Sequence, residues 1–445
     1  MKIKNIDIRF RIPVSIKLKM IADLKRTHSH AFERVGFLFT KSKHLKNGST
    51  IIIASEYIPV ADEDYLRNES VGACIGANAI RKGMQGLYNR KSGCFHVHLH
   101  NHTGRPSPSG TDIKGIPGVV ESFSNISGDQ LNGYLILSYD SFYASVMVKG
   151  KKKLQQPNLI SEIGYPFRLH YENQKREDKN EMFNRQSFLG KDSEFLFKKV
   201  RIGIIGYGGG GSHVGQQLAH VGIINIIVFD DDRIEISNMN RLIGAWLSDV
   251  AKKLLKTKIA RRVIKKILPN AIVKSVTTKW QNEPELLQSC DIIIGCVDTY
   301  SERQQLEAEC RRYLIPYIDI GMDVLEEQDK SYSMFGQIIL SMPGSACMNC
   351  YGFLTEEKLG EEAGKYGDVG GRPQVVWPNG VLASTAVGVL IDIITGWTKE
   401  KDKNVYLSYD GNTGHLTDHI RIKFAPKQCK HFLLINAGPV SFKIL

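Results

Sequence analysis

Two short stretches of the chain carry the side chains with the clearest capacity for chemistry. The first is a glycine-rich turn, GYGGGG at 206–211, which follows an apolar run at 201–205 and precedes a helical pattern. Glycines let a backbone approach an anion, and the first turn of a helix offers unpaired N–H groups. A further apolar run ends in DDD at 230–232, in the position of a ribose-binding acid. The pattern predicts one βαβ nucleotide-binding half.

The residues that follow favour ATP chemistry over hydride transfer. Arg241 ends the segment SNMNR, and Lys258 lies on a basic helical stretch. Asp298 ends a third apolar strand. Arginine and lysine suit a polyphosphate, and the remaining carboxylate suits Mg²⁺. We therefore expect a site for a magnesium nucleotide.

The second stretch is FHVHLHNH at 95–102, followed by a loop of Gly and Pro and then Ser109 and Asp112. Alternating histidines on a strand point to one face, and the loop can bring Asp112 back to meet them. Two His and one Asp leave a fourth zinc position open, which is a catalytic arrangement. A His-rich strand can also be surface decoration, but four histidines at a spacing of two favour a metal site.

The histidine register leaves an alternative open. We expect His98 and His100 to bind zinc because Val97 and His98 sit best at the end of an apolar strand, and His102 is the reserve ligand. His96 fits a supporting or core role better than a ligand role. Asp112 is the expected third ligand in every register.

With these residues in place, 184–425 resembles the ThiF/MoeB/HesA type of adenylating enzyme in the ubiquitin-activating superfamily. The resemblance implies that Asp230 binds the ribose, that Arg241 and Lys258 bind the phosphates, and that Asp298 binds magnesium. Arg185, in the segment NRQ, would reach the ATP site of the second subunit of a homodimer. The nucleotide-binding residues implied are Gly206, Gly208, Gly209, Gly211, Asp230, Asp232, Arg241, Lys258 and Asp298.

Two features of that family are only partly matched. Cys347 and Cys350 stand where the family keeps half of a zinc knot, but only Cys429, with His431 nearby, follows near the end. A structural zinc and plain buried thiols both remain open. The family's thioester cysteine would fall at 374–379, which reads QVVWPN. The acyl adenylate would then pass directly to a partner, to a cysteine elsewhere, or to a hydroxyl such as those of the nearby Ser384 and Thr385.

The first part of the chain resembles the JAB/MPN/JAMM metalloproteases. Glu33 begins a Glu-x-x-Gly segment. It precedes the pair His98-x-His100 and the motif Ser109-x-x-Asp112. The resemblance implies that Glu33 is the general base and that Ser109 helps to hold the developing oxyanion. The loop before Ser109 departs from the family's spacing by one residue, being longer from His100 and shorter from His102.

Length and composition predict two domains, and the two resemblances imply that both have α/β folds. With 445 residues and 42% hydrophobic content, the chain can bury two cores. We expect a JAB/JAMM-like domain at 1–155, a linker at 156–180 and a doubly wound, Rossmann-like ThiF domain at 181–445. The net charge of +13 fits solvated helix faces or an acidic partner protein, and no nucleic-acid recognition module accompanies it.

The remaining sequence features indicate in which cellular compartment the protein is expected. The N-terminus has no signal-type apolar region, and no apolar run reaches the length of a membrane span. Eight scattered cysteines are not spaced as a disulfide framework. We expect a reduced, cytoplasmic protein with no membrane partner.

The two resemblances together imply a bifunctional bacterial enzyme that uses ATP, Mg²⁺ and Zn²⁺. One half would adenylate the C-terminal glycine of a ubiquitin-like protein, and the other would trim or remove that protein as a deubiquitinase-like peptidase. The implied partners are the ubiquitin-like protein, a conjugating-enzyme-like acceptor and a second copy of the chain. Alternatives are activation of a sulfur carrier for cofactor biosynthesis and a non-catalytic scaffold. A role in antiphage defence is a further expectation.

Overall fold

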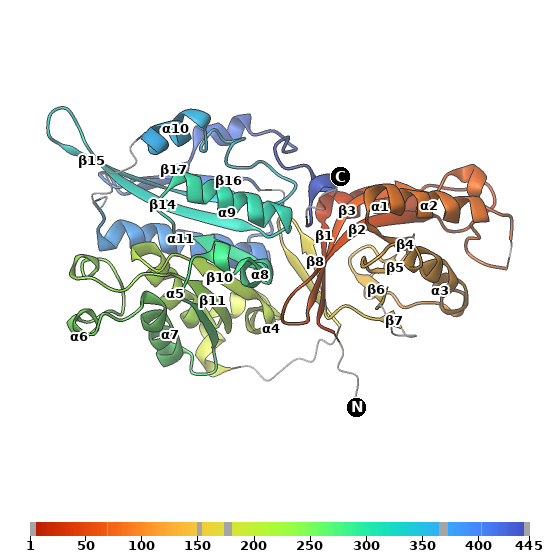
Figure 1. The fold of residues 1–445 in the computed structure, drawn as a ribbon, viewed down its shortest axis with the longest axis horizontal. Coiled ribbons are helices and arrows are strands. Elements are labelled where there is room, and N and C mark those ends of the chain that lie inside the picture. The colour runs from red at the N-terminus through yellow and green to blue at the C-terminus, as the bar shows by residue number, and fades with distance from the viewer. Residues whose placement is uncertain are drawn as a thin grey trace.

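The computed structural model describes residues 6–68, 70–148, 154–172, 180–364, 373–401 and 403–439. Over these residues the chain forms two sheets that lie side by side (Figure 1). The first has the strand order β7-β6-β5-β4-β2-β3-β1-β8-β9. Its elements are β1 (Ile8–Pro13), α1 (Val14–Leu24), β2 (Val35–His44), β3 (Thr50–Pro59), η1 (Asp62–Asp64), α2 (Ala77–Arg90), β4 (Gly93–Leu99), α3 (Gly110–Ser124), β5 (Asn132–Leu137), β6 (Phe142–Met147), β7 (Leu154–Gln155), β8 (Leu159–Ile163) and β9 (Arg168–Tyr171).

The second sheet has the order β12-β11-β10-β13-β14-β15-β16-β17. Its strands are β10 (Arg201–Ile205), β11 (Asn225–Phe229), β12 (Ile272–Val276), β13 (Ile292–Gly295), β14 (Tyr317–Glu326), β15 (Tyr332–Ser341), β16 (Val405–Asp410) and β17 (His415–Asp418). The helices are η2 (Glu181–Leu189), α4 (Ser193–Lys199), α5 (Gly209–Val221), η3 (Ile236–Asn238), α6 (Leu247–Ala251), α7 (Lys256–Ile267), η4 (Trp280–Asn282), α8 (Pro284–Gln288), α9 (Tyr300–Arg312), α10 (Glu356–Gly364), α11 (Val376–Thr395), η5 (Ile420–Phe424) and η6 (Leu434–Asn436).

The second sheet is doubly wound, as the sequence predicts. Strands β12, β11, β10, β13 and β14 run parallel, and β15 to β17 extend the sheet antiparallel. The strand order reverses at β10, which lies between β11 and β13. In such sheets ligands bind at the carboxyl ends of the strands on either side of that reversal.

The sequence also predicts a terminal strand at 420–424, and this prediction is wrong, because these residues form the 3₁₀ helix η5. The ring Nδ1 of His419 accepts a hydrogen bond from the Arg421 N–H at 3.1 Å, which caps this turn. Ile420 and Phe424 are 57% and 78% exposed. An apolar side chain that stays in water gives no burial free energy to hold a strand at the sheet edge.

The two sheets are joined through β1. Arg11 is 2% exposed, and its guanidinium donates to the carbonyls of Gln288, Cys290 and Tyr313 at 2.9, 2.8 and 2.7 Å. Arg9 donates to Asp291 Oδ1 at 2.7 Å. These contacts lie just before β13, at its amino end. The first sheet therefore packs against the amino ends of the parallel strands of the second sheet, away from their carboxyl ends.

The linker predicted at 156–180 is shorter in the structure. Strand β8 pairs with β1, and β9 pairs with β8, so residues 159–171 belong to the first sheet. Leu159, Ile160 and Ile163 are buried there. Three apolar side chains within five residues gain burial free energy in a strand that they would not gain in a solvated linker. Residues 173–179 of the predicted linker lie outside the described part of the chain.

Helix α11 is long and apolar enough to cross a membrane, contrary to the sequence expectation, and 61% of its apolar window is buried inside the structure. It packs on α5, β14 and β15. This packing is typical of a core helix.

Candidate functional site

The glycine-rich turn brings the amino end of α5 to the carboxyl end of β10. Gly206 has φ +84°, and a Cβ there would lie 2.5 Å from the Cys296 carbonyl oxygen. A Cβ on Gly211 would lie 2.0 Å from the carbonyl oxygen of Gly206. Side chains at these two positions would therefore force the turn apart. Helix α5 begins at Gly209, directly after the turn.

A cavity of about 510 Å³ opens in front of this turn, at the carboxyl ends of β10, β11 and β13. Most of the predicted nucleotide residues line it, namely Gly206, Gly208, Gly209, Asp230, Asp232, Arg241 and Asp298. Gly211 is not among the lining residues, and Gly210 takes its place. Gly211 instead lets α5 pack closely on the turn.

Two carboxylates at the end of β11 have different tasks. Asp230 accepts the Tyr207 N–H at 2.6 Å and the Asp232 N–H at 2.9 Å. Burial raises the pKa of Asp230, and Lys256 and the two N–H bonds oppose that rise. The Asp232 side chain is 67% exposed and accepts from Lys256 Nζ at 2.6 Å. Asp230 therefore holds the turn, whereas Asp232 presents the more open carboxylate.

The structure places Lys256, and not the predicted Lys258, at the cavity. Lys256 is 9% exposed and lines the cavity, whereas Lys258 is exposed and lies outside it. Both are on α7, and two residues along a helix differ by about 200° in direction. Ile259 and Ala260 are fully buried, so they mark the inward face, which Lys256 shares.

Besides Lys256, the cavity residues that the sequence did not predict include an arginine and two amide side chains. Arg303 is 5% exposed and donates from Nε to Asp319 Oδ1 at 3.0 Å. Gln374 donates to Asp298 Oδ1 at 3.4 Å, and Asn379 packs on Gly209. Arg303 lies near the start of α9, which begins directly after the segment that holds Asp298, so its position was a usable signal. Gln374 and Asn379 come from a distant segment that no local pattern could place.

Arg185 lies far from the cavity of its own chain. It is exposed on η2, where Gln186 Nε2 donates to the Val221 carbonyl at 3.0 Å and Phe183 packs on Gly222. Val221 ends α5, whose first residue, Gly209, is at the cavity. A helix of 13 residues spans about 20 Å, so η2 and the cavity lie at opposite ends of α5.

His98, His100 and Asp112 converge at the carboxyl end of β4. His98 Nε2 lies 3.2 Å from His100 Nε2 and 3.4 Å from Asp112 Oδ1, and His100 Nε2 lies 3.7 Å from Asp112 Oδ2. The three groups can hold a metal ion, since their donor atoms all lie within 4.8 Å of one another. The reserve ligand His102 is exposed, and its Nδ1 bonds to the Thr103 carbonyl at 2.8 Å.

Local structure brings Asp112 to the histidines. Ser109 caps α3: its Oγ accepts the Asp112 N–H at 3.2 Å, and Asp112 Oδ2 accepts the Ser109 N–H at 2.7 Å. This capping box directs the Asp112 carboxylate. His96 is 6% exposed and burial lowers its pKa to about 3, so it remains a neutral core histidine.

Glu33 is half-buried just before β2, whose first residue, Val35, pairs with His98 of β4. Burial and the neighbouring His98 lower the pKa of His100, while Glu33 and Asp112 raise it, so the Glu33 charge acts on a predicted ligand. The structure thus brings together the predicted base, both histidines and the aspartate.

A second metal-capable group joins two distant segments. Cys347 Sγ lies 3.5 Å from Cys350 Sγ, which lies 3.8 Å from Cys429 Sγ. The Nδ1 atom of His431 is 3.4, 3.4 and 4.0 Å from these three sulfurs, in that order. Zinc at about 2.3 Å from sulfur and about 2.0 Å from nitrogen sets tetrahedral edges of about 3.5 to 3.8 Å. The cluster fits zinc, with His431 as the fourth ligand.

We expect Cys347→Ser to remove one equivalent of zinc and to lower the Tm by about 5 °C or more, because the site ties residues 347–350 to 429–431. Metal analysis and thermal unfolding check this. Cys74→Ser is the control, since Cys74 is a half-buried thiol outside the cluster. An unchanged zinc content in Cys347→Ser would show that the four groups bind no metal.

The structure does not favour Ser384 or Thr385 as acyl acceptors. Both lie within α11 and outside the cavity lining. Ser384 Oγ accepts from Gln217 Nε2 at 3.0 Å, and Thr385 Oγ1 donates to the Val381 carbonyl at 2.9 Å. Cys296 does line the cavity, but burial raises the pKa of its thiol, which keeps it protonated.

A glycine turn, a helix amino end, two cations and carboxylates at the reversal of a parallel sheet define an α/β nucleotide-binding protein. The chain belongs to the ThiF family, whose sequence model matches residues 183–431. The cluster of His98, His100 and Asp112 lies outside this match.

Individual relatives cover less of the chain. Ubiquitin-like modifier-activating enzyme 5 of Mus musculus is 28% identical over 172 residues, which are 35% of this chain and 40% of that protein. Molybdopterin-synthase adenylyltransferase of Haemophilus influenzae is 28% identical over 141 residues, 31% of this chain and 57% of that protein. The chain thus spans about half the length of these relatives. Among solved structures, E. coli MccB with ATP has a TM-score of 0.43 and 21% identity, covering 54% of this chain and 71% of that chain.

Proposed function

We propose that the protein adenylates the C-terminal carboxylate of a small ubiquitin-like or sulfur-carrier protein. The carboxylate oxygen attacks the α-phosphorus of ATP, the bond to the β-phosphate oxygen breaks, and pyrophosphate leaves with that electron pair. The observation that carries the proposal is the 510 Å³ cavity, in which the glycine turn meets Lys256, Arg241 and Asp298. The two curated relatives named above are enzymes of carrier activation, which supports this substrate class.

Each cavity residue has a task in this reaction. The N–H groups at the start of α5 and the cations of Lys256 and Arg241 stabilise the phosphates. Asp232 accepts hydrogen bonds from the ribose, while Asp230 keeps the turn in shape. Asp298 would hold Mg²⁺, which offsets charge on the phosphates.

Carrier-dependent exchange of radioactive pyrophosphate into ATP tests this function. We expect exchange that needs both ATP and a protein with a free C-terminal glycine, and that is lost in Asp298→Asn. Exchange that is absent with every carrier tried, despite ATP binding, would favour the alternative of a scaffold.

Arg185 is expected to act in the cavity of a second copy, since about 20 Å of α5 separates η2 from the cavity of its own chain. Arg185→Ala and Asp298→Ala chains should each be inactive alone. Mixing them in equal amounts should restore about a quarter of the exchange rate, because a hybrid dimer holds one intact site. No recovery in a mixture that is shown to exchange subunits would contradict action in trans.

We propose a second activity, zinc-dependent hydrolysis of a peptide or isopeptide bond, at the His98, His100 and Asp112 cluster. Two imidazole nitrogens and a carboxylate suit zinc and leave a position open. Zinc bound there would polarise a peptide carbonyl and make water more acidic. Glu33 accepts the proton of the attacking water, and the Ser109 hydroxyl, whose oxygen already accepts an N–H, donates toward the oxyanion.

A carrier extended beyond its terminal glycine tests the hydrolase. Glu33→Ala should keep its zinc and lose cleavage, because the base is not among the three converging ligands. Retained cleavage would refute the role of Glu33. We place both activities in a cytoplasmic, bacterial ubiquitin-like pathway, in which the hydrolase exposes or releases the carrier terminus that the cavity activates.

A further inference from the structure

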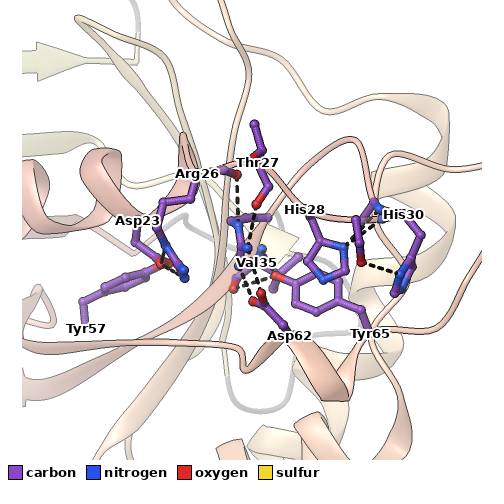
Figure 2. Close-up of polar contacts among 12 residues, drawn as sticks. Asp23, Arg26, Thr27, His28, His30, Val35, Tyr57, Asp62 and Tyr65 are labelled. Atoms are coloured by element: carbon purple, nitrogen blue, oxygen red, sulfur yellow. Dashed lines mark hydrogen bonds and ion pairs between the residues drawn. The ribbon is translucent and has the colours of Figure 1, made fainter.

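The backbone next to Glu33 is held by a buried arginine. Arg34 is 3% exposed, and its guanidinium donates to both carboxylate oxygens of Asp62 at 2.7 and 3.2 Å. It also donates to the carbonyls of Arg26 and Thr27 at 2.9 and 2.8 Å. Figure 2 shows Asp62 and the two carbonyl-bearing residues meeting at this point. The segment before Glu33 is therefore tied to the loop after β3.

Two further contacts fix the segment on either side. The Tyr65 hydroxyl accepts the Val35 N–H at 2.7 Å and lies 3.2 Å from the Val35 carbonyl (Figure 2). The Gly72 carbonyl accepts the N–H groups of both Phe32 and Glu33, at 2.8 and 2.9 Å. The Glu33 backbone thus has little freedom to shift.

Gly72 also touches the Glu33 side chain. A Cβ on Gly72 would lie 2.7 Å from Glu33 Cδ and 2.8 Å from Oε2, closer than real Cβ atoms come. Gly72 is not among the glycines with positive φ, so an alanine would fit its backbone. The glycine is needed here for space and not for backbone conformation.

We propose that Gly72 is a positioning residue, because the space left by its missing side chain seats the Glu33 carboxylate beside the His98, His100 and Asp112 cluster. This inference rests on the proposed hydrolase function of that cluster. The fixed backbone leaves the Glu33 side chain as the part that must move if the space is filled. A displaced carboxylate would no longer meet the water that it has to deprotonate.

The test is a cycle of Gly72→Ala and Glu33→Ala, made in the full chain. Gly72→Ala alone should lower kcat for cleavage of a tail-extended carrier by about 10²-fold, with KM and zinc content unchanged. Its effect on the Tm should be less favourable than the effect of the same substitution in the Glu33→Ala background. In that background no carboxylate is left to displace, and only the general effect of replacing glycine by alanine remains. Gly115→Ala on α3 is the control, because its Cβ would meet nothing within 4 Å.

The Tm values of the four chains, which are wild type, the two single variants and the double variant, test the proposal without a peptidase assay. An equal change in Tm in both backgrounds would overturn it, because the added methyl would then act independently of the Glu33 side chain. If the wild-type chain cleaves no carrier, the hydrolase proposal fails, and the Tm cycle still reports whether Gly72 seats Glu33. Full kcat in Gly72→Ala would contradict the positioning role.

Discussion

Lys256→Ala is expected to lower the rate of carrier-dependent pyrophosphate exchange by about 10²-fold or more. Lys256 is the buried lysine of the nucleotide cavity, and its Nζ is held 2.6 Å from Asp232. In the proposed reaction this charge stabilises the phosphates as negative charge builds on the leaving pyrophosphate. Part of the loss should appear as weaker ATP binding, so kcat and KM for ATP are measured separately.

Lys258→Ala is the matched control, because it removes the same charge from the same helix on the exposed side. Its exchange rate should stay within about twofold of the wild-type rate, since exposed charges are screened by water and salt. A large loss in Lys258→Ala with a small one in Lys256→Ala would show that α7 is turned differently when ATP is bound.

His100→Ala is expected to reduce zinc affinity at β4 by about 10²-fold or more and to abolish cleavage of a tail-extended carrier. The ring of His100 completes a group of three donors within 4.8 Å. Its loss leaves two ligands from the protein, which do not hold zinc firmly at neutral pH. Metal analysis should show one equivalent fewer, while zinc at the cysteine cluster remains.

His102→Ala is the control for this prediction. The His102 ring is exposed and bonds to the Thr103 carbonyl, outside the cluster. Zinc content and cleavage should both persist. The opposite pattern, with zinc lost only in His102→Ala, would restore the alternative register left open by the sequence.

The sequence predicts the local features of both sites well, because periodicity and turn chemistry are local. Glycines between a strand and a helix identify the cavity, and alternation along β4 brings His98 and His100 to one side. Lys258 was the wrong choice although the signal was present, since Ile259 and Ala260 already mark the inward face of α7. Reading the helical face would have selected Lys256.

Other features depend on contacts between distant segments. His431 joins Cys347 and Cys350 across about 80 residues of chain, and no spacing rule covers that loop. Gln374 reaches Asp298 in the same way. The strand predicted at 420–424 is wrong, because two of its three apolar side chains, Ile420 and Phe424, stay exposed and only Ile422 packs on the core. Tertiary packing decides such cases.

The arrangement of the halves bears on how the two reactions follow each other. Arg9 and Arg11 bind at the amino end of β13, whereas the cavity lies beyond its carboxyl end. The cavity and these contacts with the first sheet therefore lie at opposite ends of β13. If both proposed activities act on one carrier, its tail would have to leave one site before it enters the other.

The most direct test of carrier activation is intact-mass analysis of small proteins captured from native lysate by the Glu33→Ala chain with ATP. The Glu33→Ala substitution is expected to prevent cleavage by the proposed hydrolase, and it changes no residue that lines the cavity. The proposed function predicts a small protein whose mass has risen by that of an adenylate, or one attached to this chain, and no such species with Asp298→Asn added. Recovery of an unmodified partner despite ATP turnover would contradict adenylation of its C-terminus.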